Sequence, residues 1–236
     1  MRENVAGIIS NVKLILPNIN VRIDQTLLKY DKSWKDYERF VNESDPYNFR
    51  SLVVPSVMVP FVASIAKTPV AGVAGFPHGY VPVESKLREI DAIANGGGRE
   101  VDVVINVINV KSGKFDALRD ELQKVVRHAH ELGLGIKIIV ETSALSDDEL
   151  QKVSVAVAES GADFIKTNTG YGTRGASLRD VVLIRRFIGD RIKVKASGGI
   201  RNAVDAATFI IVGADVIGTS SGVRIMEDAR RVLKLL

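Results

Sequence analysis

The sequence predicts an α/β fold: a single (β/α)8 TIM barrel with an extra N-terminal helix. Eight short segments rich in β-branched residues alternate with longer amphipathic segments, which indicates a parallel sheet. Polar, often glycine-containing turns follow nearly every short segment. An open doubly wound sheet instead has one dominant glycine-rich loop after its first strand. Here the first strand runs into Asp24-Gln-Thr-Leu-Leu, without glycine, which favours the closed barrel.

The predicted strands are short and apolar, as is typical of parallel strands covered on both faces. They span residues 21–24, 51–54, 70–74, 101–106, 136–141, 164–167, 192–197 and 216–219. Helical periodicity follows each of the first seven strands, at residues 34–42, 57–66, 83–94, 115–132, 147–159, 178–188 and 203–211. A leading helix at 3–16 and a final one at 223–235 flank the set. Ser146 followed by three acids supports one helix start, and Gly133 and Gly161 support two helix ends.

Composition limits the classes of function. The 236 residues suit one domain, 1–236, with 46% hydrophobic and 25% charged residues. A net charge of +4 agrees with a small anionic substrate, whereas aromatic residues are too few, at 6%, to indicate nucleic-acid binding. The chain has no cysteine, and its most apolar stretch, 53–66, is interrupted by Pro55 and Pro60. We therefore expect a cytoplasmic protein that does not enter membranes.

Two lysines are placed where a charge is costly. Lys166 and Lys195 lie inside short apolar segments, each followed by a glycine-containing polar turn. If both point into the barrel from neighbouring strands, they lie close together. Burial and a second cation both favour the neutral, nucleophilic amine of a Schiff-base enzyme. The alternative is that one or both form structural ion pairs with Asp102 or Glu141. Lys193 is expected on the solvent-facing bottom rim.

Acidic residues embedded in strands are the next candidates. Asp102 and Asp24 are single carboxylates that could shuttle protons near a Schiff-base lysine, or could simply neutralise one. Glu141 is a weaker candidate. The three histidines give no convincing metal site, so none is predicted.

Small polar residues follow three consecutive strands. They are Gly170 after the sixth, Gly198 and Gly199 after the seventh, and Ser220 and Ser221 after the eighth. Exposed backbone N–H groups and hydroxyls form anion sites, and barrels often bind phosphate after strands seven and eight. Together the three loops predict a phosphate site.

Eight collinear segments, from about residue 21 to 222, resemble the deoxyribose-phosphate aldolase family. They are Ile-Asp24-Gln-Thr-Leu-Leu, Gly-Phe-Pro-His78-Gly, Glu-Val-Asp102-Val-Val-Ile-Asn-Val, Lys-Ser-Gly, Ile-Val-Glu141-Thr, Gly-Ala-Asp-Phe-Ile-Lys166-Thr-Asn-Thr-Gly, Val-Lys195-Ala-Ser-Gly-Gly-Ile-Arg and Gly-Thr-Ser-Ser-Gly. The resemblance implies a (β/α)8 class I aldolase without metal or cofactor. Such an enzyme reversibly splits 2-deoxy-D-ribose 5-phosphate into acetaldehyde and D-glyceraldehyde 3-phosphate. It also implies a homo-oligomer, a dimer or a larger assembly such as a tetramer.

The resemblance also assigns roles to residues. Lys166 becomes the Schiff-base nucleophile, Lys195 the neighbour that lowers its pKa, and Asp102 the proton-transfer group. Asp24 becomes a polar residue near the substrate, and the phosphate would be held by Gly170, Gly198, Gly199, Ser220 and Ser221. The sequence departs from the family pattern at Gln25, where many members have histidine, at Asn168, where serine is common, and at Arg174, in a loop that is often glycine-rich.

Two other functions remain open at this point. One is a barrel isomerase for a phosphorylated sugar, which would use paired carboxylates and leave the lysines without covalent work. The other is a non-catalytic sugar-phosphate-binding barrel.

Overall fold

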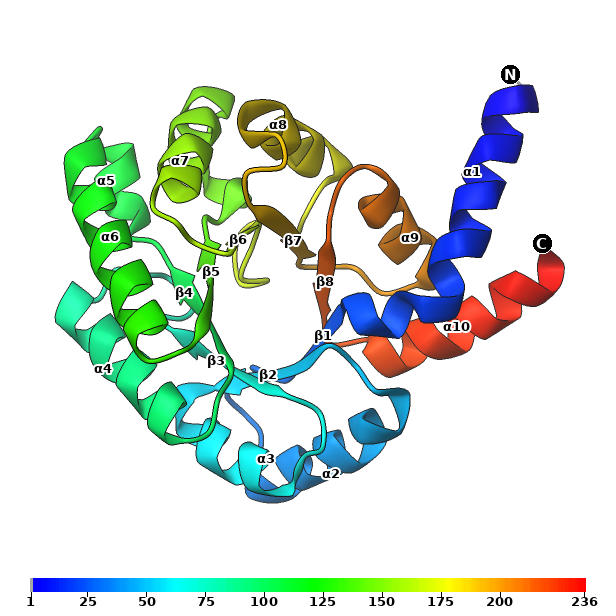
Figure 1. Cartoon of the computed structure of the whole chain (residues 1–236), viewed down its shortest axis with the longest axis horizontal. Coiled ribbons are helices and arrows are strands. Elements are labelled where there is room, and N and C mark those ends of the chain that lie inside the picture. The colour runs from blue at the N-terminus through cyan, green and yellow to red at the C-terminus, as the bar shows by residue number, and fades with distance from the viewer. Residues whose placement is uncertain (1) are drawn as a thin grey trace.

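The strands form a closed parallel barrel in the order β1 to β8, with β8 paired to β1 (Figure 1). The computed structural model describes residues 2–236, apart from the side chains of residues 2–6 and 8. The strands are β1 (Ile23–Thr26), β2 (Ser51–Pro55), β3 (Val70–Ala74), β4 (Glu100–Val104), β5 (Gly135–Ile139), β6 (Phe164–Lys166), β7 (Lys193–Ser197) and β8 (Val216–Thr219). The predicted eight-stranded barrel is confirmed.

Helices surround the barrel (Figure 1). They are α1 (Arg2–Ile15), α2 (Trp34–Ser44), α3 (Val59–Ile65), α4 (Val83–Asn95), α5 (Val107–Lys111), α6 (Phe115–Glu131), α7 (Asp147–Glu159), α8 (Leu178–Ile188), α9 (Ala203–Ile211) and α10 (Gly222–Leu235). Short 3-10 helices are η1 (Leu16–Arg22), η2 (Asp45–Tyr47), η3 (Ser56–Met58) and η4 (Thr142–Ala144). The predicted N-terminal helix is present as α1, which packs beside α9 and extends away from the barrel (Figure 1).

Several predicted boundaries were wrong by a few residues. β1 begins at Ile23 because η1 takes up the residues before it. β4 and β5 each end two residues before the predicted limit, where the chain leaves the barrel wall. The predicted helix 57–66 divides into η3 and α3, with Pro60 in the first turn of α3, where its missing N–H costs nothing. The short helix α5 was not predicted.

Apolar residues fill two separate regions. The large core lies between the strands and the helices, and contains residues such as Leu52, Ile138 and Ile217. A small second cluster comprises Val53, Ala71 and Val73 of β2 and β3, with Leu28 and Phe76 packed against it. These three strand residues alternate with the members of the large core, so they point into the barrel. On this side, therefore, the barrel interior is apolar.

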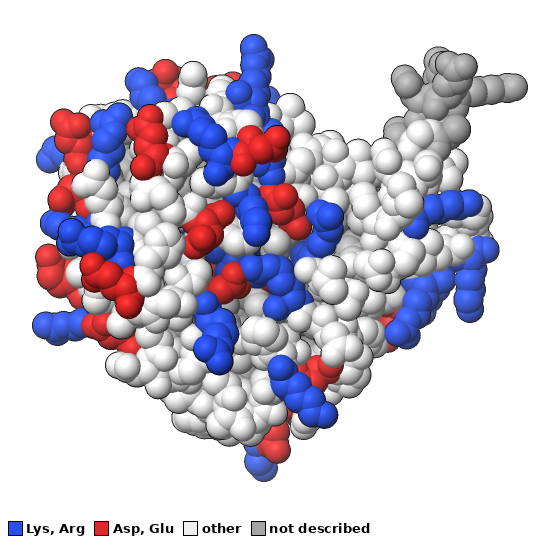
Figure 2. Space-filling view, in the orientation of Figure 1, with Lys and Arg blue, Asp and Glu red and all other residues white. Residues whose placement is uncertain are grey.

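Charges of both signs are interspersed over much of the face that Figure 2 shows, whereas Lys and Arg predominate at the right, over α10. Among the described residues, no helix has the length and apolar character needed to cross a membrane.

Candidate active site

Lys166 and Lys195 are neighbours across the barrel wall. They are register partners on the parallel strands β6 and β7. Both point into the barrel, as the alternation predicted, and both are almost completely buried, at 3% and 0% exposure. Lys193, two residues before Lys195, is exposed at the lower end of β7, also as predicted.

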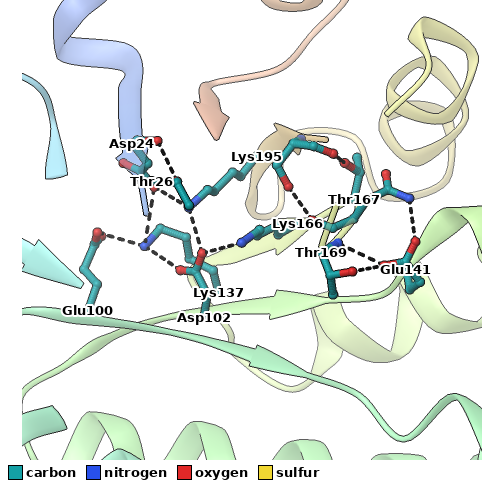
Figure 3. A network of polar contacts seen from close by, with 12 residues as sticks. Asp24, Thr26, Glu100, Asp102, Lys137, Glu141, Lys166, Thr167, Thr169 and Lys195 are labelled. Atoms are coloured by element: carbon teal, nitrogen blue, oxygen red, sulfur yellow. Dashed lines mark hydrogen bonds and ion pairs between the residues drawn. The ribbon is translucent and has the colours of Figure 1, made fainter. Parts of the chain in front are cut away.

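Asp102 joins the two lysines. Its Oδ2 accepts from Lys166 Nζ at 2.8 Å and from Lys195 Nζ at 2.7 Å (Figure 3). The carboxylate is fully buried on β4, and burial by itself raises its pKa. The surrounding lysines outweigh burial and hold the pKa of Asp102 well below its usual range. Asp102 is therefore an anion that can accept a proton only when a lysine charge is lost or displaced.

A third lysine lies beneath the pair and was missed from sequence. Lys137 of β5 is the register partner of Asp102 and is completely buried. Its Nζ lies 3.1 Å from Asp102 Oδ1 and 2.8 Å from Glu100 Oε2 (Figure 3). Burial opposes its charge, but attraction to Asp102, Asp24 and Glu100 raises the pKa of Lys137 above its usual value. Lys137 thus remains a cation that anchors Asp102 from below.

Asp24 continues the chain of ion pairs downward. Its carboxylate lies 2.6 Å from Lys195 Nζ and 2.7 Å from Arg50 Nη1. Arg50 also binds Glu100, which closes the network at the lower end of the barrel. Asp24 is fully buried and does not line the cavity described below. Asp24 contacts Lys195, and its position beside the substrate stays a prediction.

Lys166 has a lowered pKa. Burial is the largest cause, the neighbouring cations Lys195 and Lys137 add to it, and Asp102 opposes it; the result is a pKa of about 8. A substantial fraction of Lys166 is then neutral near pH 8. Such an amine can attack a carbonyl carbon.

Lys166 opens into a cavity of about 510 Å³ at the carboxyl ends of the strands. The β6, β7 and β8 loops contribute Gly170, Gly198, Gly199 and Ser220 to its lining, as the phosphate prediction requires. Ser221 lies just beyond this lining, at the start of α10. The exposed cations Lys29 and Arg201 also line the cavity, and neither was predicted.

The glycines of the β7 loop have conformations that other residues avoid. Gly198 has φ of 102° and Gly199 has φ of 82°. A Cβ atom on Gly198 would also approach Gly175 Cα to 3.0 Å. Both positions therefore require glycine, and their backbone borders the cavity directly.

Glu141 organises the β6 loop rather than the lysines. Its carboxylate accepts from Asn168 Nδ2 at 2.9 Å, from Thr169 N at 2.9 Å and from Thr169 Oγ1 at 2.7 Å, and also from Ser143 (Figure 3). The residue has φ of 54°, a left-handed conformation that aims its side chain at this loop. Burial raises its pKa, but these donors outweigh burial and lower it. The ion pair with a lysine considered from sequence is not observed for Glu141.

Gln25, Asn168 and Arg174, which depart from the family pattern, each form hydrogen bonds within the protein. Gln25 Oε1 accepts from Gly222 N at 2.8 Å, at the start of α10. Asn168 is fully buried between Glu141 and Thr142. Arg174 Nη2 donates to Asp180 Oδ1 at 3.0 Å, in the first turn of α8. Each departure is thus accommodated by a local contact.

A family model described as "DeoC/LacD family aldolase" matches residues 19–228. The chain belongs to this aldolase family. Three bacterial and archaeal relatives named deoxyribose-phosphate aldolase support the assignment. The chain is 40% identical to that of Carboxydothermus hydrogenoformans over 210 residues, 87% of this chain and 92% of the relative. It is 41% identical to that of Thermoanaerobacter pseudethanolicus, over 89% and 96% of the two chains. It is 40% identical to that of Thermococcus gammatolerans, over 88% and 95%.

Solved structures of aldolases are also similar. A structure titled "QR15, an Aldolase" superposes with a TM-score of 0.88 at 39% identity, covering 93% of this chain and 99% of the other. The deoxyribose phosphate aldolase of Aeropyrum pernix, whose title describes a tetramer, gives 0.87 at 30% identity, covering 95% and 97%. The fold and the family are thus shared along nearly the whole chain.

Proposed function

We propose that the protein is a class I aldolase that reversibly cleaves 2-deoxy-D-ribose 5-phosphate into acetaldehyde and D-glyceraldehyde 3-phosphate. Lys166 carries the proposal: it is a buried lysine of lowered pKa, beside a second lysine, that opens into a cavity with three polar loops. The names of the aldolase relatives support the choice of substrate.

Catalysis begins with the neutral amine of Lys166. Its Nζ attacks C1 of the open-chain substrate, and proton transfer gives a carbinolamine. The C1 oxygen then leaves as water, and a protonated imine remains on Lys166. Lys195 keeps the amine nucleophilic through its charge, and both lysines contact Asp102 Oδ2.

Cleavage of the C2–C3 bond follows. Its electron pair forms the C1–C2 double bond of an enamine, and the positive charge on nitrogen is neutralised. Asp102, acting through a water molecule, takes the proton from the C3 hydroxyl, and C3 becomes the aldehyde carbon of glyceraldehyde 3-phosphate. The enamine is then protonated at C2, and water hydrolyses the imine to acetaldehyde and free Lys166.

The loops after β6, β7 and β8 hold the phosphate in this proposal. Gly170, Gly198, Gly199 and Ser220 line the cavity, and backbone N–H groups and hydroxyls of this kind bind anions. Ser221, directly before α10, is the fifth phosphate-binding residue of this proposal. Lys29 and Arg201 add positive charge at the cavity.

Borohydride trapping tests the proposal. Reduction in the presence of acetaldehyde should add one ethyl group, located by peptide mass spectrometry on Lys166. Cleavage of deoxyribose 5-phosphate should be measured in parallel, with detection of glyceraldehyde 3-phosphate. Lys166→Arg should lose both signals, whereas Lys193→Arg, at the exposed end of β7, should keep both. A Lys166→Arg enzyme with full cleavage activity would falsify the assignment. Cleavage without a trapped adduct would exclude a Schiff base on Lys166, and the absence of both signals from the original enzyme would favour the isomerase or the binding protein.

We further propose that residues 1–236 act as one catalytic domain and assemble as a homo-oligomer in the cytoplasm. Exposed apolar residues near the N-terminal segment, Leu14 at 73% and Val21 at 57%, offer surface for assembly. Light scattering after gel filtration should give a mass of at least twice 25.6 kDa. A monomer at micromolar concentration would overturn the assembly, and cell fractionation tests the location.

A further inference from the structure

The mouth of the barrel contains a second cavity. It has a volume of about 620 Å³ and lies among the loops that follow β1, β2 and β3. Most of its lining is apolar, including Val57, Met58, Val73 and Phe76. It adjoins the apolar cluster inside the barrel, because Val73 belongs to that cluster and Phe76 packs against it. The proposed catalytic steps make no use of this space.

Tyr171 separates the second cavity from the first. Its side chain comes from the β6 loop, and its Oη donates to the carbonyl oxygen of Leu28, in the β1 loop, at 2.9 Å. The ring also stands edge-on to Phe76 of the β3 loop, with 5.5 Å between ring centroids. Both cavities have Tyr171 in their linings, together with Leu28, Lys29 and Tyr30 of the β1 loop. Tyr171 thus bridges three loops and forms, with the β1 loop, a wall common to the two cavities.

The position of Lys166 sets the direction in which a donor aldehyde extends. Lys166 and the loops after β7 and β8 belong to the first cavity only. When the imine carbon is bonded to Lys166 and the phosphate lies on these loops, a substituent on the donor carbon projects away from the phosphate. The second cavity lies among the loops after β1, β2 and β3, and Tyr171 and Phe76 line it. A methyl donor needs no space there, whereas a longer chain meets the wall.

We propose that Tyr171 is a specificity-determining residue that restricts the aldol donor to the smallest aldehydes, by closing the apolar second cavity to the donor chain. This inference rests on the proposed aldolase function. Removing the ring joins the two cavities and gives an aliphatic donor chain an apolar surface to bind.

The test compares donors in the synthetic direction, with glyceraldehyde 3-phosphate as acceptor. The readout is the ratio of kcat/KM for butanal to kcat/KM for acetaldehyde. Tyr171→Ala should raise this ratio about tenfold, since each methylene that enters an apolar site is worth a factor of about four. Tyr171 is 43% exposed, so its removal leaves no void in the core. Tyr80→Ala is the matched control: this tyrosine is exposed in the β3 loop, lines neither cavity, and should leave the ratio unchanged.

Tyr171→Phe separates the ring from its hydrogen bond. It removes the donor to Leu28 and keeps the ring, so the ratio should stay close to that of the original enzyme. An unchanged ratio in Tyr171→Ala overturns the inference, as does an equal increase in Tyr171→Phe. Borohydride trapping of acetaldehyde on the unmodified enzyme reports separately on the proposed function: if no adduct forms on Lys166, the aldolase assignment fails. If the adduct forms and the ratio does not change, only the role of Tyr171 fails.

Discussion

Lys166 and Lys195 donate to the same oxygen, Asp102 Oδ2, at 2.8 and 2.7 Å. Since the two lysines are register partners, the geometry of the barrel wall itself holds them side by side. Only Lys166 also lines the cavity. Both lysines are buried and bind one carboxylate, but access to the cavity favours Lys166 as the nucleophile and leaves Lys195 as its neighbour.

The rate of imine formation should rise with pH. Because the pKa of Lys166 is lowered to about 8, mainly by burial, the neutral amine increases through pH 8 and is nearly complete well above it. Single-turnover trapping of acetaldehyde between pH 6 and 10 should give a midpoint near 8. The same shift has a consequence for stability. The pKa of Lys166 is lower in the folded protein than in the unfolded chain, so the unfolded chain binds more protons between pH 8 and 10.5. The contribution of Lys166 to the free energy of unfolding therefore rises with pH over this range. A midpoint above 10 would contradict the assigned environment.

Lys195→Met should move that midpoint upward. The positive charge of Lys195 lowers the pKa of Lys166, in addition to the larger effect of burial, and its loss also leaves Asp102 Oδ2 to Lys166. The amine would then be less often neutral at pH 7, and trapping would slow. Lys193→Met, on the same strand but exposed, provides the control and should keep the original midpoint. An unshifted midpoint in Lys195→Met would remove Lys195 from its assigned role.

Lys137→Met should be strongly destabilising. It would take one completely buried cation away from Asp102, Asp24 and Glu100, and loss of one member of a buried ion pair typically costs about 3–5 kcal/mol. Urea unfolding measures the change. Lys193→Met removes an exposed lysine that lies over the ring of Phe164, and should cost no more than about 1 kcal/mol. Equal stability of the two variants would show that Lys137 does not support Asp102.

Glu141→Gln should disturb the β6 loop. The amide N–H group of a glutamine would face the donors of Ser143, Asn168 or Thr169, so at least one hydrogen bond to the carboxylate would be lost. A hydrogen bond to a charged group typically contributes about 1.5–3 kcal/mol to the free energy of unfolding. Since Thr169 lines the cavity, we expect a higher KM for the phosphorylated substrate together with lower stability. Glu38→Gln, at an exposed position of α2, is the control for the loss of one negative charge. An unchanged KM would limit Glu141 to a structural role.

The sequence was sufficient to predict the barrel and the proximity of Lys166 to Lys195. Strand alternation predicted that Lys166 and Lys195, if they point inward, are neighbours, and they are buried register partners. Lys166 ends β6 and Lys195 is the middle residue of β7, and the residues beside them in the strands belong to the large outer core. Strand ends were harder to predict. In β4 and β5 the apolar run continues past the last ladder residue, so composition does not reveal where the chain turns away.

Lys137 was missed for a related reason. The lysines chosen from sequence were each followed by a polar turn, whereas Lys137 is followed by Ile138 and Ile139. The signal that could have identified Lys137 was its position within an apolar strand segment. Tyr171 could not be predicted, because its contacts with Leu28 and Phe76 join loops that are distant in sequence.

The buried ion-pair network has one more positive than negative group when every member is ionised. It contains four cations and three anions, namely Arg50, Lys137, Lys166 and Lys195 with Asp24, Glu100 and Asp102. With Lys166 deprotonated the interior becomes electroneutral, so the reactive state of the enzyme is also its charge-balanced state. Formation of the iminium restores the surplus positive charge. In carbon–carbon cleavage the nitrogen becomes neutral, and the proton taken up by Asp102 carries the surplus instead. The neighbouring charges of Lys195 and Lys137, which favour loss of the proton from the amine, thus also favour electron flow toward its nitrogen in the bond-breaking step.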